Sequence, residues 1–305
     1  MAITAAMVKE LREKTGSGMM DCKKALEQTG GDMEAAIDEL RKKGLATAQK
    51  RAGRIAAEGL TAVIVSEDSK TAGVVEVNSE TDFVANNDLF RSFVKEVADQ
   101  ALIADTSDID TFMNSKWHLD ETKTVNDALV DKISVIRENL KIRRVQMLKS
   151  DCYVGSYVHG GGRISVLVAA KSDVVNDEFK EAVKNVAMQV CSMKPEYKSE
   201  ADIPQEVLDH ERAILMEQAA SEGKPQAILA KMVEGRLKKE MKELCLMDQL
   251  FFRDQEISVA KYLDQVSKNI GSKIEIESYI RFETGEGIEK KQENFAEEVA
   301  KQMKA

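Results

Sequence analysis

The chain has 305 residues, of which 43% are hydrophobic and 32% are charged, and its net charge is −9. With only 3 prolines and 5% aromatic residues, this composition indicates a helix-rich globular protein with a substantial core and excludes a disordered architecture. The negative charge disfavours a general nucleic-acid binder, and no apolar run reaches the ~20 residues of a membrane span.

The N-terminal part is predicted to form three short helices followed by a linker. Helix-capping residues and glycines mark where each helix starts and ends. These signals are Thr4 as the first cap, Gly16–Gly18 as the first break, a second helix over Met19–Gln28, Asp32 as the third cap and Gly44 as the final stop. We therefore expect residues 45–57 to be the linker.

The middle of the chain shows one pattern twice. In each copy two strands with alternating hydrophobicity are joined by a short turn and followed by an amphipathic helix. The first copy comprises Leu60–Val65, Ala72–Val77 and helix Asp88–Leu102, and the second comprises Tyr153–His159, Ile164–Ala170 and helix Glu178–Val190. Available third strands are Ile142–Leu148 and Ile274–Phe282, and helix Val125–Glu138 would cover the first sheet. The repetition predicts an α+β fold with two related subdomains, whose antiparallel sheets are covered by helices.

Two further helices interrupt the second copy. They are predicted over Gln205–Ser221 and Gln226–Leu244, and Gly223-Lys-Pro225 forms the turn between them. Their apolar side chains can face each other in an antiparallel hairpin, with Leu208, Ile214 and Leu215 opposite Ile228, Met232 and Met241.

The tail from Glu286 to Ala305 is predicted to be a C-terminal helix. Its apolar side chains follow one stripe, which consists of Ile288, Phe295, Val299 and Met303. The stripe can pack either on the body of the chain or on a partner.

Motifs for covalent chemistry or metal binding do not occur in the sequence. The four cysteines have no paired spacing, the three histidines are scattered, and no P-loop, dinucleotide-binding pattern or nucleophile elbow is found. We therefore expect no enzyme, no cofactor and no metal site. The N-terminus lacks the charged flank and apolar centre of a secretion signal, so we expect a cytoplasmic protein.

The stretch Glu76-Val-Asn-Ser-Glu-Thr-Asp-Phe-Val-Ala-Asn86 places an aromatic residue on a polar turn between a strand and a helix. Asp82 before the aromatic Phe83, and Asn86 after it, favour turns and helix caps. A large apolar side chain on such a turn is costly unless something receives it. Phe83 can therefore contact a partner, or it can fold back as a staple onto the helix that it precedes.

This stretch resembles one signature of the elongation factor Ts family, the nucleotide-exchange factors of the GTPase elongation factor Tu. The stretch Leu11-Arg-Glu-Lys-Thr-Gly-Ser-Gly-Met-Met-Asp-Cys-Lys-Lys-Ala-Leu26 resembles the family's other signature. The likeness continues through Gly287-Ile-Glu-Lys290 and so covers essentially the whole chain.

The resemblance implies a five-part organisation. The parts are a ubiquitin-associated-like three-helix domain with its linker (1–56), a core N-subdomain (57–151), a core C-subdomain (152–200 and 246–285), a coiled-coil hairpin insertion (201–245) and a C-terminal helical module (286–305).

The resemblance also implies a function. The chain would bind GDP-loaded elongation factor Tu, displace its Mg²⁺ and release GDP, which leaves a nucleotide-free partner that GTP can enter. The residues implied to intrude near the partner's Mg²⁺ are Thr81, Asp82, Phe83 and Val84, with Phe83 as the wedge. Further implied partner contacts are Arg12, Met19, Met20, His159, Ile288 and Phe295. One of the two methionines is expected to belong to the core instead.

Other interpretations remain at this stage. The chain could be a scaffold that uses its N-terminal helices to capture a peptide. Asp82 could bind Mg²⁺ directly, but a lone carboxylate is a poor site for that ion. Neither nucleic acid nor a membrane is expected as a partner, and a homodimer or a heterotetramer with elongation factor Tu stays open.

Overall fold

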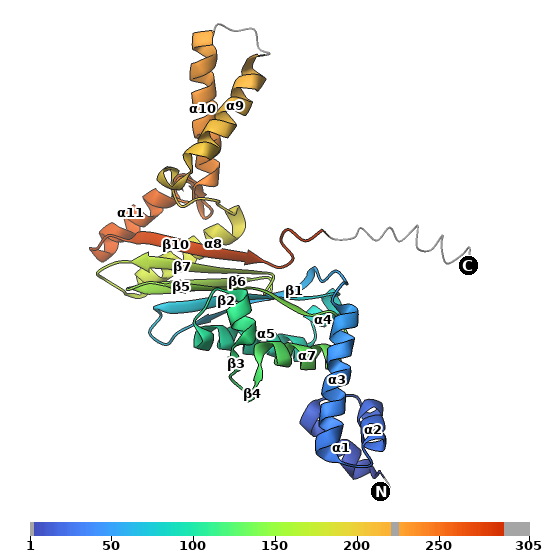
Figure 1. Ribbon diagram of the computed structural model, residues 1–305. Coiled ribbons are helices and arrows are strands. Elements are labelled where there is room, and N and C mark those ends of the chain that lie inside the picture. The colour runs from blue at the N-terminus through green and yellow to red at the C-terminus, as the bar shows by residue number, and fades with distance from the viewer. Residues whose placement is uncertain (1–2, 221–225, 290–305) are drawn as a thin grey trace. The chain divides into compact units, whose positions relative to one another are not determined.

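The computed structural model describes residues 3–220 and 226–289 (Figure 1). Its contacts divide the chain into two compact units. The first comprises Met1–Thr61, Val75–Val145 and Glu283–Ala305, and the second comprises Ala62–Val74 and Gln146–Phe282. Both units combine helices with strands, so the predicted α+β class is confirmed.

The first three helices begin where the capping residues predict. They are α1 (Ala5–Thr15), α2 (Met19–Gln28) and α3 (Met33–Arg51). The Thr4 hydroxyl accepts a hydrogen bond from the Met7 N–H at 3.3 Å, and the Asp32 carboxylate accepts one from the Ala35 N–H at 3.1 Å. Buried Leu11, Cys22 and Leu26 form the centre of a small core between the helices.

The predicted helix stop at Gly44 is wrong. Helix α3 continues to Arg51, because the residues after Gly44 are mostly good helix formers. Gly44 lies buried inside the helix, where a Cβ would be 3.4 Å from the Cβ of Ser134 on helix α7 (Val125–Ile136). Gly44 thus lies at the contact between α3 and α7, where there is room for a methyl group, and the first half of the predicted linker is helical.

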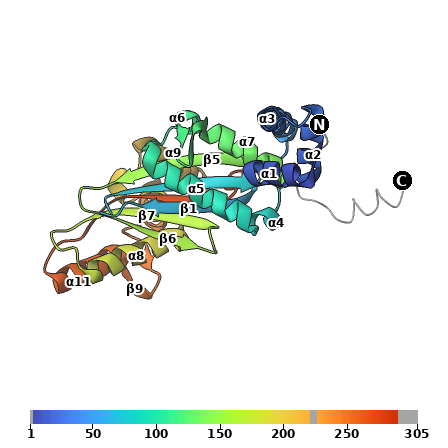
Figure 2. The same cartoon turned by 90° about the horizontal axis from the view of Figure 1, so that it is seen from below.

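One sheet has the strand order β1-β2-β5, with bounds Glu58–Val65, Thr71–Ser79 and Lys141–Lys149. Helix α5 (Asp88–Ala104) and helix α7 contact each other and lie over one face of this sheet (Figures 1 and 2). The α5 side chains Phe90, Phe93 and Val97 are completely buried. All these elements agree with the predicted ones to within a few residues.

The other sheet has the order β10-β7-β6, with bounds Glu275–Glu283, Ile164–Lys171 and Tyr153–His159. Strands β6 and β7 pair antiparallel, from Tyr153 opposite Ala170 to His159 opposite Ile164. Helix α8 (Asp177–Met193) packs on both strands, and helix α11 (Val259–Ile270) packs on α8. The predicted elements do not include α11, although its buried Val259, Leu263 and Val266 recur at helical spacing.

Each unit also contains a short hairpin that the predicted elements lack. The two hairpins are β3–β4 (Lys116–Trp117 and Asp120–Thr124), which follows helix α6 (Ile109–Asn114), and β8–β9 (Leu250–Phe251 and Asp254–Ser258). They share one register, because Trp117 pairs with Asp120 and Phe251 pairs with Asp254.

A buried glutamine from a long helix earlier in the same unit, α5 or α8, holds each hairpin. The Oε1 atom of Gln100 accepts a hydrogen bond from the His118 N–H at 2.8 Å, and Oε1 of Gln189 accepts one from the Phe252 N–H at 2.8 Å. The same local arrangement therefore occurs once in each unit.

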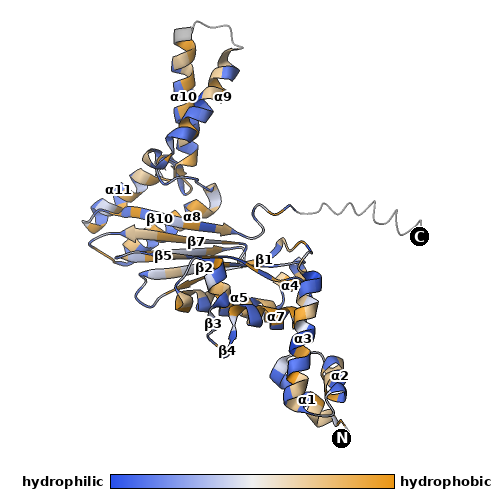
Figure 3. Cartoon of the chain, in the orientation of Figure 1, coloured by the Kyte–Doolittle hydropathy of each residue, from blue (hydrophilic) through white to orange (hydrophobic). Residues whose placement is uncertain are grey.

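A helical hairpin projects within the second unit, formed by α9 (Gln205–Ala220) and α10 (Gln226–Leu244) after the short 3-10 helix η1 (Glu200–Asp202). Its buried seam consists of Leu215, Ala219, Leu229, Val233, Leu237 and Met241. Ile214 and Ile228 are exposed, so their predicted place in the seam is wrong. The buried side chains of α10 recur every four residues from Leu229 to Met241, so the buried face is rotated by one position from the predicted face, which began at Ile228. Figure 3 shows hydrophilic and hydrophobic residues interspersed along both helices.

The base of this hairpin is closed by backbone contacts. Tyr197 and Cys245 form a parallel bridge, and the Leu246 N–H donates a hydrogen bond to the Tyr197 carbonyl at 2.9 Å. The two chain segments that enter and leave the hairpin are thus joined before the helices diverge from the body of the unit.

The predicted C-terminal helix does not begin at Glu286. Residues 284–287 form a turn, because Gly285 and Gly287 both have φ of +73°, which a right-handed helix does not allow. Phe295, Val299 and Met303 lie outside the described residues. Within the described ranges, each helix is too short or too polar to traverse a lipid bilayer.

Candidate functional site

Phe83 lies on a single helical turn, α4 (Asp82–Ala85), that follows strand β2. Thr81 caps this turn, and its hydroxyl accepts a hydrogen bond from the Val84 N–H at 3.3 Å. The Phe83 side chain is 84% exposed, so the staple interpretation, in which the ring packs on the following helix, is wrong. A large apolar side chain is therefore presented to solvent on a short capped turn.

A carboxylate from a distant loop holds the start of this turn. One oxygen of Glu138 accepts hydrogen bonds from the N–H groups of Glu80 and Thr81, both at 3.1 Å. Its other oxygen accepts a hydrogen bond from the Thr81 hydroxyl at 2.6 Å. Glu138 thus fixes both the backbone and the side chain of the residue that caps α4.

The Glu80 side chain makes the reciprocal connection. Its carboxylate accepts a hydrogen bond from the Asn139 N–H at 2.5 Å and forms ion pairs with Arg54 at 3.2 Å and Arg51 at 3.7 Å. The Asn139 side chain in turn donates a hydrogen bond to the Arg54 carbonyl at 2.7 Å. Two carboxylates therefore connect the Phe83 turn to the segment between α7 and β5.

Asp82 and Val84 flank the exposed ring. Asp82 is exposed, and its carbonyl accepts a hydrogen bond from the Asn86 side chain at 3.0 Å. Val84 is half-buried. Among residues 3–220 and 226–289, no group of three or more histidines, cysteines or carboxylates is arranged to hold a metal ion.

The predicted contact residues of the N-terminal helices lie where α1 ends and α2 begins. Arg12 is exposed, and Met19 and Met20 are 58% and 64% exposed. The expectation that one methionine belongs to the core is therefore wrong. Both side chains offer flexible apolar surface on the first turn of α2.

Asp21 follows the two methionines and binds two cations. Its carboxylate accepts hydrogen bonds from Lys43 at 2.5 Å and from Arg137 at 2.7 Å. The hydrogen bond from Lys43, assisted by the charge of Arg137, holds the pKa of the Asp21 carboxyl below its ordinary value. These contacts connect the methionine-bearing helix to α3 and to the end of α7.

The remaining predicted contact residues lie elsewhere. His159 ends strand β6 in the second unit, and its Nδ1 atom is 3.1 Å from the Tyr157 hydroxyl. Ile288 is half-buried, and its N–H donates a hydrogen bond to the Gly285 carbonyl at 3.0 Å. Phe295 is outside the described residues. The first unit thus holds the Phe83 turn, the methionine pair, Arg12 and Ile288.

A buried carboxylate that the sequence interpretation does not single out secures the start of the tail. Glu76 has no exposed surface and receives hydrogen bonds from Arg143 at 3.1 Å, from Arg144 at 2.5 Å and from the Gly285 N–H at 2.8 Å. Arg143 also donates a hydrogen bond to the Glu286 carbonyl at 2.6 Å. The signal in the sequence is an acidic residue inside the apolar strand Val74-Val75-Glu76-Val77, since a charge there requires partners.

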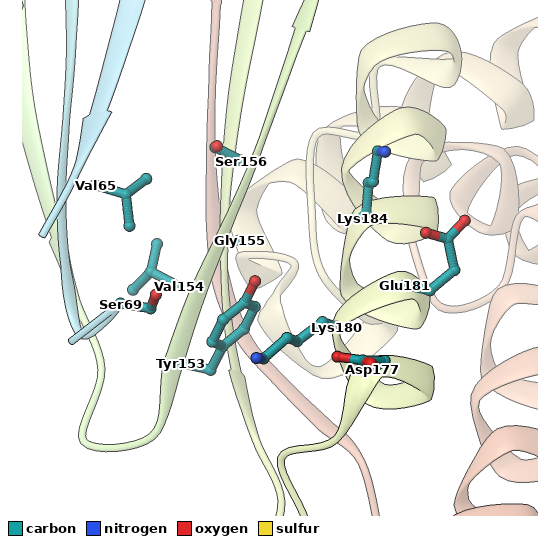
Figure 4. A pocket seen from close by; sticks show the side chains of 10 residues that line it. All are labelled: Val65, Ser69, Tyr153, Val154, Gly155, Ser156, Asp177, Lys180, Glu181 and Lys184. Carbon is teal, nitrogen blue, oxygen red and sulfur yellow. The ribbon is translucent and has the colours of Figure 1, made fainter. Parts of the chain in front are cut away.

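A cavity of about 380 Å³ lies in the second unit between β6 and α8 (Figure 4). Charged side chains of α8 line one side of it, and Tyr153, Gly155 and Ser156 line the other. Its lining contains no histidine or cysteine, so the cavity lacks a nucleophile with an adjacent base of the Ser–His or Cys–His kind.

Comparison with known proteins identifies relatives along nearly the full length. The family model described as Elongation factor TS matches residues 80–286. The elongation factor Ts of Clostridium novyi (strain NT) is 50% identical over 302 residues, which cover 99% of each protein. The elongation factor Ts proteins of Clostridioides difficile (strain 630) and Clostridium tetani (strain Massachusetts / E88) are 48% and 47% identical over 302 residues, again 99% of each protein.

Proposed function

The chain belongs to the elongation factor Ts family of translation elongation factors, and we propose that it is the guanine-nucleotide exchange factor for elongation factor Tu. It binds the GDP-loaded partner, displaces Mg²⁺ and releases GDP, so that GTP can enter the vacated site. No covalent step is involved, because exchange needs only a higher affinity for the nucleotide-free state than for the GDP-bound state.

The observation that carries this proposal is the 84% exposure of Phe83 on a turn whose backbone is already fixed. Burial of one phenylalanine side chain contributes about 1.5–3 kcal/mol, which can offset a local rearrangement in the partner. A turn held in place before contact loses little conformational entropy on binding. Phe83 is therefore suited to act as a wedge beside the partner's Mg²⁺, with Thr81, Asp82 and Val84 setting the shape of the turn.

The coupling between factor and nucleotide is reciprocal. The bound factor weakens the binding of GDP to the partner by a certain free energy. Bound nucleotide weakens the binding of the factor to the partner by the same amount. The factor is therefore released when GTP enters the partner, and one molecule can serve many GTPase molecules in turn.

The family assignment also supports the remaining partner contacts. Arg12, Met19 and Met20 form the N-terminal contact, His159 forms a second contact, and Ile288 with Phe295 forms the contact of the tail. It supports the five-part domain organisation, with a ubiquitin-associated-like N-terminal domain, two related subdomains, a coiled-coil insertion and a C-terminal module. A cytoplasmic location follows from a role in translation elongation.

The decisive experiment measures the release of labelled GDP from purified elongation factor Tu, with and without this protein. The wild-type chain should accelerate release, and Phe83→Ala should slow the accelerated rate by more than about tenfold if Phe83 is a hot spot. Leu119→Ala is the matched control, because Leu119 is an exposed apolar residue outside the turn. Binding without any acceleration would instead indicate the scaffold function.

A further inference from the structure

We propose that Glu138 is a positioning residue that holds the Phe83 turn in its contact-ready conformation. The inference rests on the proposed function for its effect on exchange, but the geometry is independent of any partner. Glu138 is 57 positions along the chain from Thr81, and it contacts the start of the turn through both carboxylate oxygens.

The Glu138 carboxylate is matched to the donors that face it. It accepts two backbone N–H groups and one hydroxyl, at 3.1, 3.1 and 2.6 Å, and a carboxylate has lone pairs for all three. Hydrogen bonds to an ionised acceptor are stronger than those between neutral groups. The Thr81 hydroxyl donates to Glu138, which leaves its oxygen free to accept the Val84 N–H and cap α4.

The turn needs this support because it cannot be stable alone. Helix α4 has four residues, and forming a first helical turn in isolation is unfavourable. Packing of the Phe83 ring contributes little to its stability, since the ring is largely exposed. The orientation of the ring therefore depends on the hydrogen bonds that hold the turn, among which those at Thr81 fix its start.

The reciprocal bond from Asn139 to Glu80 makes the connection two-sided. Glu138 holds the backbone of the turn, and Glu80 holds the backbone beside Glu138 through the Asn139 N–H. A displacement of either segment breaks hydrogen bonds on both, so the two segments move together. The turn and the α7–β5 connection therefore form one hydrogen-bonded unit.

Three variants test the proposal: Glu138→Ala, Glu138→Gln and the double variant Glu138→Ala/Phe83→Ala. Alanine removes all three acceptor contacts. Glutamine has the same shape, and its carbonyl can accept both N–H groups while its amide donates to the Thr81 hydroxyl oxygen. The exposed Glu121→Ala in the same unit is the control for loss of a surface carboxylate.

Glu138→Ala should slow the release of GDP from elongation factor Tu that this chain stimulates, roughly tenfold to a hundredfold, as misplacement of a contact group does. Glu138→Gln should restore most of the rate, and Glu121→Ala should match wild type. In the Phe83→Ala background, Glu138→Ala should add little further loss, because it acts through Phe83. A merely structural role would not produce this dependence on Phe83. Equal impairment by alanine and glutamine, a wild-type rate for Glu138→Ala, or multiplying losses in the double variant would overturn the proposal.

A second measurement needs no partner. Hydrogen exchange of the Glu80 and Thr81 amides should be slow in the wild-type chain and in Glu138→Gln, and fast in Glu138→Ala, at a temperature where all three remain folded. If the wild-type chain failed to accelerate GDP release, the proposed function would fail while this measurement still decided whether Glu138 holds the turn. Unchanged protection in Glu138→Ala would refute that role directly.

Discussion

The Arg137 guanidinium donates a 2.7 Å hydrogen bond to the carboxylate of Asp21, across 116 positions of the chain. Arg137 immediately precedes Glu138, which holds the Phe83 turn, and Asp21 immediately follows Met19 and Met20. The short connection between α7 and β5 therefore contacts both the Phe83 turn and the helix that begins with Met19 and Met20.

Replacing Asp21 by asparagine should weaken the attachment of α2. The side chain of Asp21 is partly exposed, so each of its two ion pairs contributes only about 0.2–1 kcal/mol to the free energy of unfolding. Urea unfolding at neutral pH measures this loss. Asp38→Asn, at an exposed carboxylate of α3, is the control and should change stability less.

The same residue predicts a pH dependence. The pKa of Asp21 is lower in the folded chain than in the unfolded chain, where it is about 3.9. Its contribution is therefore complete above the unfolded pKa and is lost as the pH falls through the lower, folded pKa. Unfolding measured from pH 6 down into the acid range should show a smaller decrease for Asp21→Asn than for wild type. Parallel curves would contradict this assignment.

Gly44→Ala should stabilise the protein or leave it unchanged. An alanine gains up to about 1 kcal/mol of helix propensity over glycine, and its Cβ would make an ordinary contact at 3.4 Å with Ser134. Gly155→Ala is the contrasting variant, because its Cβ would lie 2.8 Å from the buried Val183 and should destabilise the chain by about 1–3 kcal/mol. Urea unfolding midpoints compare the two. A clear loss of stability in Gly44→Ala would show that α3 and α7 cannot accommodate a methyl group.

Glu76→Ala should be strongly destabilising. Breaking a buried ion pair typically costs about 3–5 kcal/mol, and the loss here should lie at the lower end because the side chains of Arg143 and Arg144 are 24% and 28% exposed. The exposed pair of Lys273 and Glu275, 3.8 Å apart, provides the control, and Glu275→Ala should change the free energy of unfolding by less than about 0.5 kcal/mol. Chemical unfolding measures both variants. Similar small losses in both would mean that Arg143 and Arg144 find water or other partners once the carboxylate is gone.

Val233→Asp and Ile228→Asp should differ in their effect on the helical hairpin. Val233 is 1% exposed in the seam between α9 and α10, whereas Ile228 is 49% exposed. A buried unpaired carboxylate disrupts packing, but an exposed one is hydrated. Limited proteolysis should cleave the Val233→Asp hairpin rapidly and leave Ile228→Asp as resistant as wild type. Equally rapid cleavage of both variants would show that Ile228 also packs in the seam between α9 and α10.

Local signals in the sequence predict most element boundaries. Thr4 and Asp32 cap helices in the structure because their side chains bond to nearby N–H groups, a relationship that spans only three residues. The prediction that a helix stops at Gly44 is wrong because the role of this glycine depends on a distant residue. Gly44 packs against Ser134, which lies 90 positions away in the sequence and is brought close only by folding.

The candidate site divides in the same way. The sequence places Phe83 on a polar turn but leaves open whether the ring is exposed or packs on the following helix, and the structure shows that it is exposed. The supports of the turn cannot be predicted in this way, because Glu80 and Glu138 resemble ordinary solvated surface residues until tertiary contacts bring them together. Similarly, the seam of the helical hairpin depends on helix rotation, which a pattern of closely spaced apolar residues leaves uncertain by one position.

The bridge between Tyr197 and Cys245 has an evolutionary consequence. The two chain segments that enter and leave the helical hairpin are joined by hydrogen bonds at this bridge. Residues of α9 and α10 can therefore be gained or lost without altering how α8 packs near the β8–β9 hairpin. A relative can therefore have a longer or shorter helical hairpin while the rest of the unit keeps its fold.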